Sequence, residues 1–182
     1  MNLPNKITVL RILLVPVVLF FVYHIESNLA FNLAAIFLFL AVSLTDTLDG
    51  HIARSRNLIT DFGKFLDPLA DKILVISTMI VLMDLGYLHS IAVIIVMIRE
   101  FVVTSLRLVA SSNNLVIAAS KWGKAKTVTQ MAVILLLMMT PMLQSFSCFS
   151  VIAQVCVWCM VLITLYSGID YLVKNKQVLK EK

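Results

Sequence analysis

Four aspartates at fixed spacing interrupt an otherwise apolar chain, and they constrain what it can fold into more than any other feature. They lie in two stretches, D-T-L-D-G-H-I-A-R at residues 46–54 and G-K-F-L-D-P-L-A-D at residues 63–71. The flanking segments 29–44 and 73–83 are almost wholly apolar. Because a carboxylate at membrane depth is costly, we interpret these four as functional residues.

The composition is that of an integral membrane protein. Of the 182 residues, 60% are hydrophobic and only 14% are charged, which excludes an ordinary soluble core. The first apolar run is too long for a cleavable signal peptide. No alternating barrel pattern appears, and helices satisfy their own backbone polar groups in lipid. We therefore predict an all-α membrane protein that forms a single domain over residues 1–182.

The apolar runs predict six transmembrane helices, each near the length of about 20 residues that the hydrocarbon core requires. The predicted spans are residues 7–23, 29–52, 63–85, 91–110, 124–139 and 149–171. Arg11 lies too deep in the first run to be a simple anchor. We therefore expect a short N-terminal amphipathic helix at the membrane interface that continues into the first span.

The distribution of basic residues predicts the orientation of these spans. Fourteen of the fifteen lysines and arginines lie at one set of span ends and loops, whereas the loops around Glu26, Gly86 and Gln144 contain none; the fifteenth, Arg99, lies within a span. The positive-inside rule places both termini and the aspartate motif on the cytoplasmic side of the cell membrane.

The spacing of the aspartates points to a metal site. On helices, Asp46 and Asp49 share a face at i, i+3, and Asp67 and Asp71 share a face at i, i+4. Four oxygen ligands without a nearby cysteine suit Mg²⁺ or Mn²⁺. Two such ions about 4 Å apart are used for displacement at phosphorus.

The same acids could instead form a structural salt-bridge cluster at the membrane surface. Their partners would be the nearby cations Arg54, Arg56, Lys64 and Lys72. Such a cluster does not require this regular spacing, so we favour the metal site.

The three cysteines lie near the end of the chain, at Cys148, Cys156 and Cys159. Two of them stand at i, i+3 in an apolar run that contains no histidine. We expect all three to be buried apolar side chains that form neither a metal site nor a disulfide.

The motif D-x2-D-G-x2-A-R-x8-G-x3-D-x3-D resembles the signature of the CDP-alcohol phosphotransferase family, and this chain fills every fixed position. The resemblance implies an enzyme that joins a CDP-activated lipid or alcohol to an acceptor hydroxyl and releases CMP. It also implies a pair of Mg²⁺ or Mn²⁺ ions held by Asp46, Asp49, Asp67 and Asp71. Asp71 would in addition be the catalytic general base.

The same resemblance assigns CDP binding to Gly50, Ala53, Arg54 and Gly63. Small side chains would let the nucleotide approach the helix backbone, Arg54 would pair with a phosphate, and Gly63 would permit a close turn. Tight helix packing is the alternative role for Gly50 and Ala53. Membrane-surface anchoring is the alternative for Arg54.

Further stretches resemble the family members that transfer a phosphatidyl group from CDP-diacylglycerol to sn-glycerol 3-phosphate in anionic phospholipid synthesis. They are N-L-P-N-K-I-T-x-x-R near the start, R-E-F-x-V-T-x-L-R-L, G-K-x-K-T, and S-G-x-D-Y near the end. The likeness implies a homodimer embedded in membrane lipid, and we expect no nucleic-acid partner. Outside the fixed positions the chain departs from the common pattern, for example at His51 and Ser105.

Cations of the fourth and fifth spans predict the kind of acceptor. Arg107, Lys124 and Lys126 would converge on the cytoplasmic side if these spans are neighbours, and they would then bind the phosphate of the acceptor. Anchoring to anionic lipid is their alternative role. Arg99 and Glu100 are adjacent and cannot pair across one helix face, so we expect their partners on other helices.

The sequence is also compatible with other functions. The acceptor could be inositol phosphate, serine, or phosphatidylglycerol as in a cardiolipin synthase of this fold, although the three cations argue against serine. A transporter or channel would use buried carboxylates near the bilayer midplane and repeated spans, whereas here the acids lie at span ends and no repeat is visible. A non-catalytic scaffold leaves the four aspartates unexplained.

Overall fold

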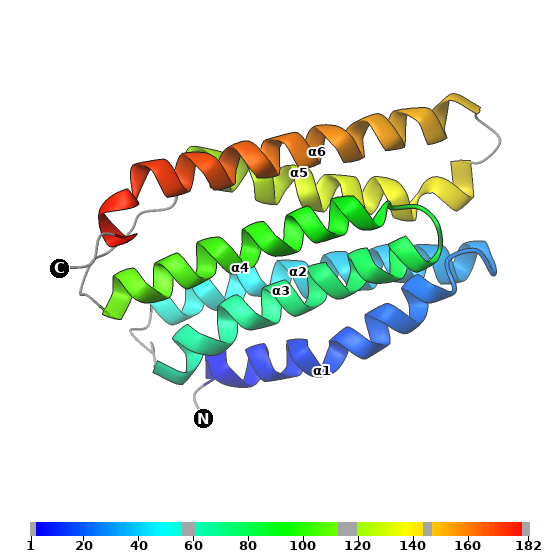
Figure 1. Ribbon diagram of the computed structural model, residues 1–182. Coiled ribbons are helices and arrows are strands. Elements are labelled where there is room, and N and C mark those ends of the chain that lie inside the picture. The colour runs from blue at the N-terminus through cyan, green and yellow to red at the C-terminus, as the bar shows by residue number, and fades with distance from the viewer. Residues whose placement is uncertain (1–2, 56–60, 113–119, 144–146, 180–182) are drawn as a thin grey trace. The chain divides into compact units, whose positions relative to one another are not determined.

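The computed structural model describes residues 3–55, 61–112, 120–143 and 147–179, and within these ranges it contains helices and no strand. Side chains are described there except at 3–7, 46–55, 61–68, 71, 112, 147, 178 and 179. The helices are α1 (Leu3–Tyr23), α2 (Leu29–Ser55), α3 (Asp61–Asp84), α4 (Ser90–Ser112), α5 (Lys121–Met138), the short 3-10 helix η1 (Thr140–Leu143), α6 (Ser147–Lys174) and the 3-10 helix η2 (Lys176–Leu179) (Figure 1). The predicted all-α class is confirmed.

The chain divides into two compact units. Unit 1 comprises Met1–Tyr87 and Met138–Ser145, and unit 2 comprises Leu88–Leu137 and Phe146–Lys182. Unit 1 therefore contains α1, α2, α3 and η1, whereas unit 2 contains α4, almost all of α5, and α6.

In unit 1, α1 packs against both α2 and α3 (Figure 1). Valines 15, 18 and 22 recur at helical spacing along one stripe of α1 and are buried. The helix is continuous from Leu3 to Tyr23 and contains Pro16, and it bends part-way along its length in Figure 1. A proline inside a helix removes one backbone hydrogen bond, which is a known cause of bending. No turn separates an interfacial piece from the rest of α1 within these residues.

Two polar side chains fix the beginning of α2. The side chain of Asn28 accepts a hydrogen bond from the backbone N–H of Phe31 at 2.9 Å, which is the N-cap interaction that starts a helix. One turn later, the buried Nδ2 of Asn32 donates to the carbonyl oxygen of Met138 at 2.9 Å. The second bond ties the first turn of α2 to the segment that contains η1.

The end of α3 is set by a glycine. Gly86 has φ of +82°, a left-handed conformation that glycine adopts without steric cost. The N–H of Gly86 bonds to Met83 O at 3.0 Å, and the N–H of Tyr87 bonds to Leu82 O at 2.9 Å. This pair of bonds is a Schellman motif, so the turn predicted around Gly86 is confirmed.

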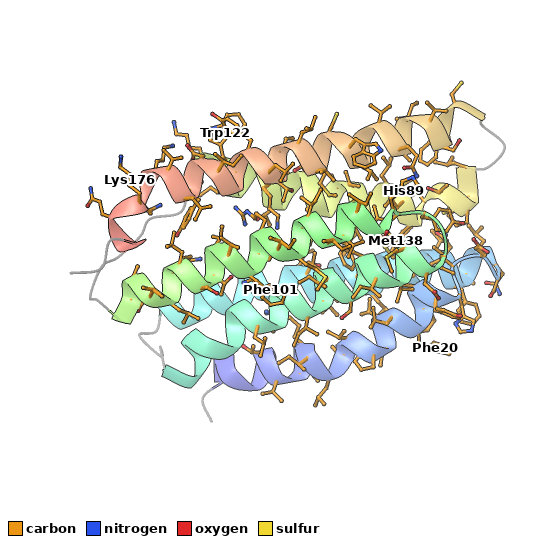
Figure 2. The ribbon with its side chains drawn as sticks, in the orientation of Figure 1. Phe20, His89, Phe101, Trp122, Met138 and Lys176 are labelled. Atoms are coloured by element: carbon orange, nitrogen blue, oxygen red, sulfur yellow. The ribbon has the colours of Figure 1, made fainter. Side chains whose placement is uncertain are left out.

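In unit 2, α4 packs against α6, and their apolar contact includes Val103, Leu106 and Tyr171. The helix α5 begins after Ser120, whose Oγ accepts a hydrogen bond from the N–H of Gly123 at 3.0 Å. Its first turn carries Trp122, which is labelled in Figure 2 and packs edge to face on Tyr166 of α6 with ring centroids 4.6 Å apart.

Within the described residues, one helix is both long and apolar enough to cross a membrane, namely Cys148–Lys174. Two shorter apolar helical stretches are Thr8–Tyr23 and Leu29–Thr45. The outer face of α6 exposes large apolar side chains at heptad-like spacing, among them Val151, Val155, Trp158, Leu162, Ile169 and Val173.

The prediction of three buried cysteines is wrong. Cys148 and Cys159 are exposed and Cys156 is half-buried, although the three form no disulfide, as expected. The two exposed thiols are on α6, much of whose apolar surface is not covered by another helix. An apolar sequence context therefore did not imply burial within the protein.

Candidate active site

The two halves of the aspartate motif lie on two helices of unit 1. Residues 46–54 form the last part of α2, and residues 63–71 lie near the beginning of α3. Both stretches have helical backbone, so the predicted i, i+3 and i, i+4 registers of the two aspartate pairs apply. The same helices carry Gly50, Ala53, Arg54 and Gly63. The side chains of the four aspartates and of Arg54 lie outside those the structure describes, and their roles stay predictions.

A buried arginine of α1 reaches the beginning of the motif. Arg11 is 2% exposed, and its Nε donates a hydrogen bond to Thr45 Oγ1 at 3.4 Å. Thr45 Oγ1 in turn donates to the carbonyl oxygen of Val42 at 2.6 Å. Since Thr45 directly precedes Asp46, the helix α1 contacts α2 at the turn where the motif begins. The sequence had marked Arg11 as a charge within an apolar run and as the last residue of a stretch that resembles the family, but this contact was not foreseen.

The donor set of the motif fits hard divalent cations. Four carboxylates supply only oxygen ligands, which Mg²⁺ and Mn²⁺ prefer. They come from α2 and α3, which pack together within unit 1. Among the side chains that the structure describes elsewhere, no group of three or more His, Cys, Asp or Glu could hold a metal ion. The oxygen-only donor set of the motif is therefore compatible with such an ion.

A second polar cluster lies within unit 2, where one carboxylate oxygen joins two cations. Glu100 Oε1 accepts hydrogen bonds from Arg99 NH1 at 2.8 Å and from Lys126 Nζ at 2.5 Å. Arg99 NH2 also donates to Ser167 Oγ at 2.7 Å. We call these four residues the Glu100 cluster. It joins α4, α5 and α6, since Arg99 and Glu100 are on α4, Lys126 is on α5 and Ser167 is on α6.

The cluster is deeply buried although it carries charge. The side chains of Arg99, Glu100 and Lys126 are 10%, 14% and 5% exposed, and Ser167 is fully buried. The next residue on α4, Phe101, lies on a different side of the helix and is exposed (Figure 2). An ion cluster withdrawn from water requires close, well-placed partners to offset its desolvation.

Two glycines line the path of Arg99. A Cβ atom added to Gly168 on α6 would lie 3.1 Å from Arg99 Cγ, which is tighter than ordinary contact. A Cβ atom on Gly123 of α5 would lie 3.3 Å from Ser120 Oγ and 3.9 Å from Arg99 NH2. The absence of a side chain at Gly168 therefore lets the arginine stem pass along α6 to reach Ser167.

One expectation about this region is confirmed and another is wrong. Arg99 and Glu100 do have partners on other helices, as predicted. They also pair with each other, contrary to the prediction, since Arg99 NH1 lies 2.8 Å from Glu100 Oε1.

The three cations predicted to bind the acceptor differ in their surroundings. Lys126 is buried and bound to Glu100, whereas Arg107 on α4 and Lys124 on α5 are exposed. Arg107 is two turns beyond Arg99 on the same helix, and Lys124 lies half a turn before Lys126. The convergence of the three on one ligand stays a prediction.

Comparison with known proteins identifies the family. The family model described as CDP-alcohol phosphatidyltransferase matches residues 1–166 of the chain. The chain belongs to the CDP-alcohol phosphatidyltransferase family. The match includes both halves of the aspartate motif and all of the Glu100 cluster except Ser167.

Curated relatives are similar over most of their length. A protein of Bacillus subtilis (strain 168) is 39% identical over 98% of this chain and 97% of its own length. A protein of Rickettsia bellii (strain RML369-C) is 35% identical over 93% of both chains, and one of Wigglesworthia glossinidia brevipalpis is 39% identical over 74% of this chain and 75% of its own. All three are named CDP-diacylglycerol--glycerol-3-phosphate 3-phosphatidyltransferase. The resemblance seen in the sequence is thereby confirmed.

Proposed function

We propose that this chain transfers the phosphatidyl group from CDP-diacylglycerol to sn-glycerol 3-phosphate, giving phosphatidylglycerophosphate and CMP. The observation that carries this conclusion is the near full-length similarity to the Bacillus subtilis protein of that name, at 39% identity. The complete aspartate signature in two neighbouring helices supports it. The product places the enzyme in the synthesis of anionic phospholipids.

The aspartate motif would hold the donor and its metal ions. Asp46, Asp49, Asp67 and Asp71 are the proposed ligands of two Mg²⁺ or Mn²⁺ ions, which the oxygen-only donor set supports. Such ions, when bound, supply positive charge that neutralises the diphosphate oxygens and the departing CMP. Gly50, Ala53, Arg54 and Gly63 would contact the CDP moiety, with Arg54 bonding a phosphate oxygen.

The transfer itself requires one proton acceptor from the chain. Asp71 would take the proton from the attacking hydroxyl of glycerol 3-phosphate. The resulting oxygen forms a bond to the phosphorus that carries the diacylglycerol. The bond from that phosphorus to the oxygen of CMP breaks, and CMP leaves with the electron pair. Close positioning of the two substrates, more than covalent chemistry by the protein, is what such a displacement needs.

The acceptor's phosphate would be bound by Arg107, Lys124 and Lys126. Charge-assisted bonds from lysine and arginine are strong and suit a phosphate dianion. Exposure of Arg107 and Lys124 is compatible with a ligand that enters from water. Serine has no phosphate, so a serine acceptor would not explain why these three cations are present.

In the membrane, we propose that the six α-helices are six spans of one domain, with both termini and the aspartate motif facing the cytoplasm and the first turns of α1 at the interface. The helix bounds support this, because each predicted span overlaps one helix. The exposed apolar side chains of α6 also support it, since lipid would cover them. We further propose a homodimer, as the family resemblance implies.

One assay tests the proposed function directly. The purified protein is supplied with CDP-diacylglycerol and Mg²⁺, and CMP release is measured against glycerol 3-phosphate, inositol phosphate, serine, phosphatidylglycerol and glycerol. Glycerol 3-phosphate should give the highest kcat/KM. Greater turnover with any other acceptor would reassign the chain within its family, and no CMP release with any of them would reject the transferase function.

A further inference from the structure

A small pocket lies at the end of unit 1 that is remote from the aspartate motif. It is formed by the turn between α1 and α2, by the first turn of α2 and by η1, which contacts α2. Along α2, Asn32 of the pocket precedes Asp46 by 14 residues, which corresponds to about 21 Å of helix. Figure 1 shows the α1–α2 turn at one end of unit 1 and the beginning of α3 at the other. A ligand in this pocket would therefore be bound outside the proposed catalytic site.

The size of the pocket limits what it can hold. Its volume is about 170 Å³. Pockets for drug-sized ligands and cofactors usually exceed about 300 Å³, whereas one water molecule occupies about 30 Å³ of the liquid. The space therefore suits a group of a few non-hydrogen atoms. Leu29, Pro141 and Met142 provide apolar walls, so methylene groups can be accommodated beside a polar end.

Asn32 supplies a buried hydrogen-bond acceptor to this pocket. The residue is 1% exposed, and its Nδ2 donates to the carbonyl oxygens of Met138 at 2.9 Å and Ile25 at 3.4 Å. Since a carbonyl oxygen can only accept, these bonds fix which end of the amide is nitrogen. The other end, Oδ1, is buried and accepts no hydrogen bond from the residues that the structure describes. A buried amide oxygen without a donor is costly, so this atom favours a ligand that carries N–H or O–H groups.

Glu26 supplies negative charge to the same pocket. Its Oε1 accepts a hydrogen bond from the O–H of Tyr87 at 2.6 Å. That bond restrains the carboxylate, whose two oxygens can accept further hydrogen bonds. No lysine or arginine is among the described residues that line the pocket. The pocket therefore combines hydrogen-bond acceptors with a negative charge, and a small cationic donor is the ligand that complements it.

We infer that this pocket binds a primary ammonium group, which belongs either to a lipid head group or to a free amine. An ammonium has three N–H donors, so one can bond to Asn32 Oδ1 and another to the Glu26 carboxylate. The attached carbon atoms would lie against the apolar walls. A calcium ion fits less well, because it takes about six to eight oxygen ligands and these two side chains supply fewer. In the proposed membrane orientation, the pocket lies on the outer side, at the depth of the head groups.

The experiment compares ammonium ligands that differ in their N–H donors. Purified full-length protein in detergent micelles is titrated with free ethanolamine or with phosphatidylethanolamine, and an apparent Kd is obtained from the shift in thermal midpoint. Choline and phosphatidylcholine of the same acyl chains keep the charge but have methyl groups in place of the N–H donors. The ethanolamine ligand should raise the midpoint by about 2–4 °C. Its N-methylated counterpart should bind about tenfold more weakly or worse, because it cannot bond to Asn32 Oδ1.

A variant of Glu26 tests the charge at constant side-chain length. Glu26 is exposed, and the amide oxygen of Glu26→Gln can still accept from Tyr87, so the change should leave the fold intact. The Kd for the ethanolamine ligand should rise about tenfold or more, as expected for the loss of a charge-assisted bond. Asp84→Asn is the matched control, because it removes an exposed carboxylate of unit 1 that does not line the pocket. It should change the Kd by less than about twofold, since surface charges contribute little.

The outcomes identify both the ligand and its source. Similar affinity for free ethanolamine and for the lipid would show that the amine alone is recognised, whereas binding of the lipid alone would identify a membrane head group; either result supports the inference. It would be overturned by an absence of any shift with both ligands, by equal affinity for the N-methylated compounds, or by an unchanged Kd in Glu26→Gln. CMP release is not measured in this experiment, so the result does not depend on the proposed function.

Discussion

Arg11 of α1 donates a hydrogen bond from Nε to Thr45 Oγ1 of α2 at 3.4 Å, across 34 positions of sequence. Arg11 is buried, and Thr45 is the residue before the first aspartate of the motif. A guanidinium inside an apolar bundle is costly unless it is bonded. The contact therefore links the packing of α1 to the position of the turn that begins the proposed metal site.

We expect the change Arg11→Met to weaken metal binding. Methionine keeps an apolar stem but cannot bond Thr45, so the turn before Asp46 loses a support from α1. The Mg²⁺ concentration for half-maximal activity should rise about tenfold, in the range that outer-shell partners of metal ligands contribute. Mg²⁺ titration and the thermal midpoint measured without metal would check this.

The matched control for Arg11 lies on the same helix. Leu13→Met changes a side chain that is 67% exposed and should leave both measurements unaltered. An unchanged Mg²⁺ requirement in Arg11→Met, with only a lower thermal midpoint, would show that the contact serves stability alone.

Neutralising the proposed metal ligands should abolish turnover. Asp46→Asn, Asp49→Asn and Asp67→Asn each remove a charged oxygen ligand while they keep the shape of the side chain. Activity should fall to background in each, with the protein still folded in detergent, and EDTA should do the same reversibly. Asp84→Asn, at an exposed position at the end of α3, is the control that should retain activity. Full activity in EDTA would refute the metal site.

Sequence reasoning located the helices well but not the side-chain partners across them. Apolar runs end at polar turns, and the turn signals around Asn28 and Gly86 correspond to real helix boundaries. The pairing of Glu100 with Lys126 could not be foreseen, because it depends on how α4 and α5 are rotated about their axes. Periodicity indicates which residues share a face but not what that face contacts.

Because the sequence does not show what a helix face contacts, the burial of the cysteines was predicted wrongly, whereas the aspartate motif could be recognised. In a soluble protein an apolar run predicts burial, whereas a helix that faces lipid, as we propose for α6, keeps apolar side chains uncovered by protein; Cys148 and Cys159 on α6 are exposed. The aspartate motif was recognisable because its chemistry requires a fixed spacing on helices. The contact of Arg11 with Thr45 could not be predicted in this way, since it depends on the packing of α1 against α2.

The proposed orientation predicts where introduced thiols can be labelled. In a background with all three native cysteines replaced, a cysteine at Asn57 should react with a membrane-impermeant reagent only from the cytoplasm. A cysteine at Ser90, the first residue of α4, should react only from outside. Replacement of the native thiols is essential because Cys148 and Cys159 are themselves exposed. The reverse labelling pattern would contradict the orientation and place the aspartate motif away from a cytosolic acceptor.

The exposed cations Arg107 and Lys124 should determine the choice of acceptor. Each charge-assisted bond to a phosphate contributes roughly 1.5–3 kcal/mol, so Arg107→Ala or Lys124→Ala should raise the KM for glycerol 3-phosphate about tenfold to a hundredfold. The KM for CDP-diacylglycerol should change much less, because other residues are proposed to hold the diphosphate. Both constants are measured at saturating Mg²⁺.

Lys176→Ala is the matched control for these two changes, because Lys176 is an exposed lysine in η2 to which no acceptor role is assigned (Figure 2). It should leave both KM values unaltered, since membrane-surface charge alone does not select an acceptor.

Glycerol provides a second control in the unmodified enzyme. If glycerol competes as well as glycerol 3-phosphate, the acceptor phosphate contributes nothing to binding. If Arg107→Ala and Lys124→Ala raise only the KM for the lipid donor, these cations serve the membrane surface or the CDP moiety, and the acceptor's phosphate must be recognised elsewhere.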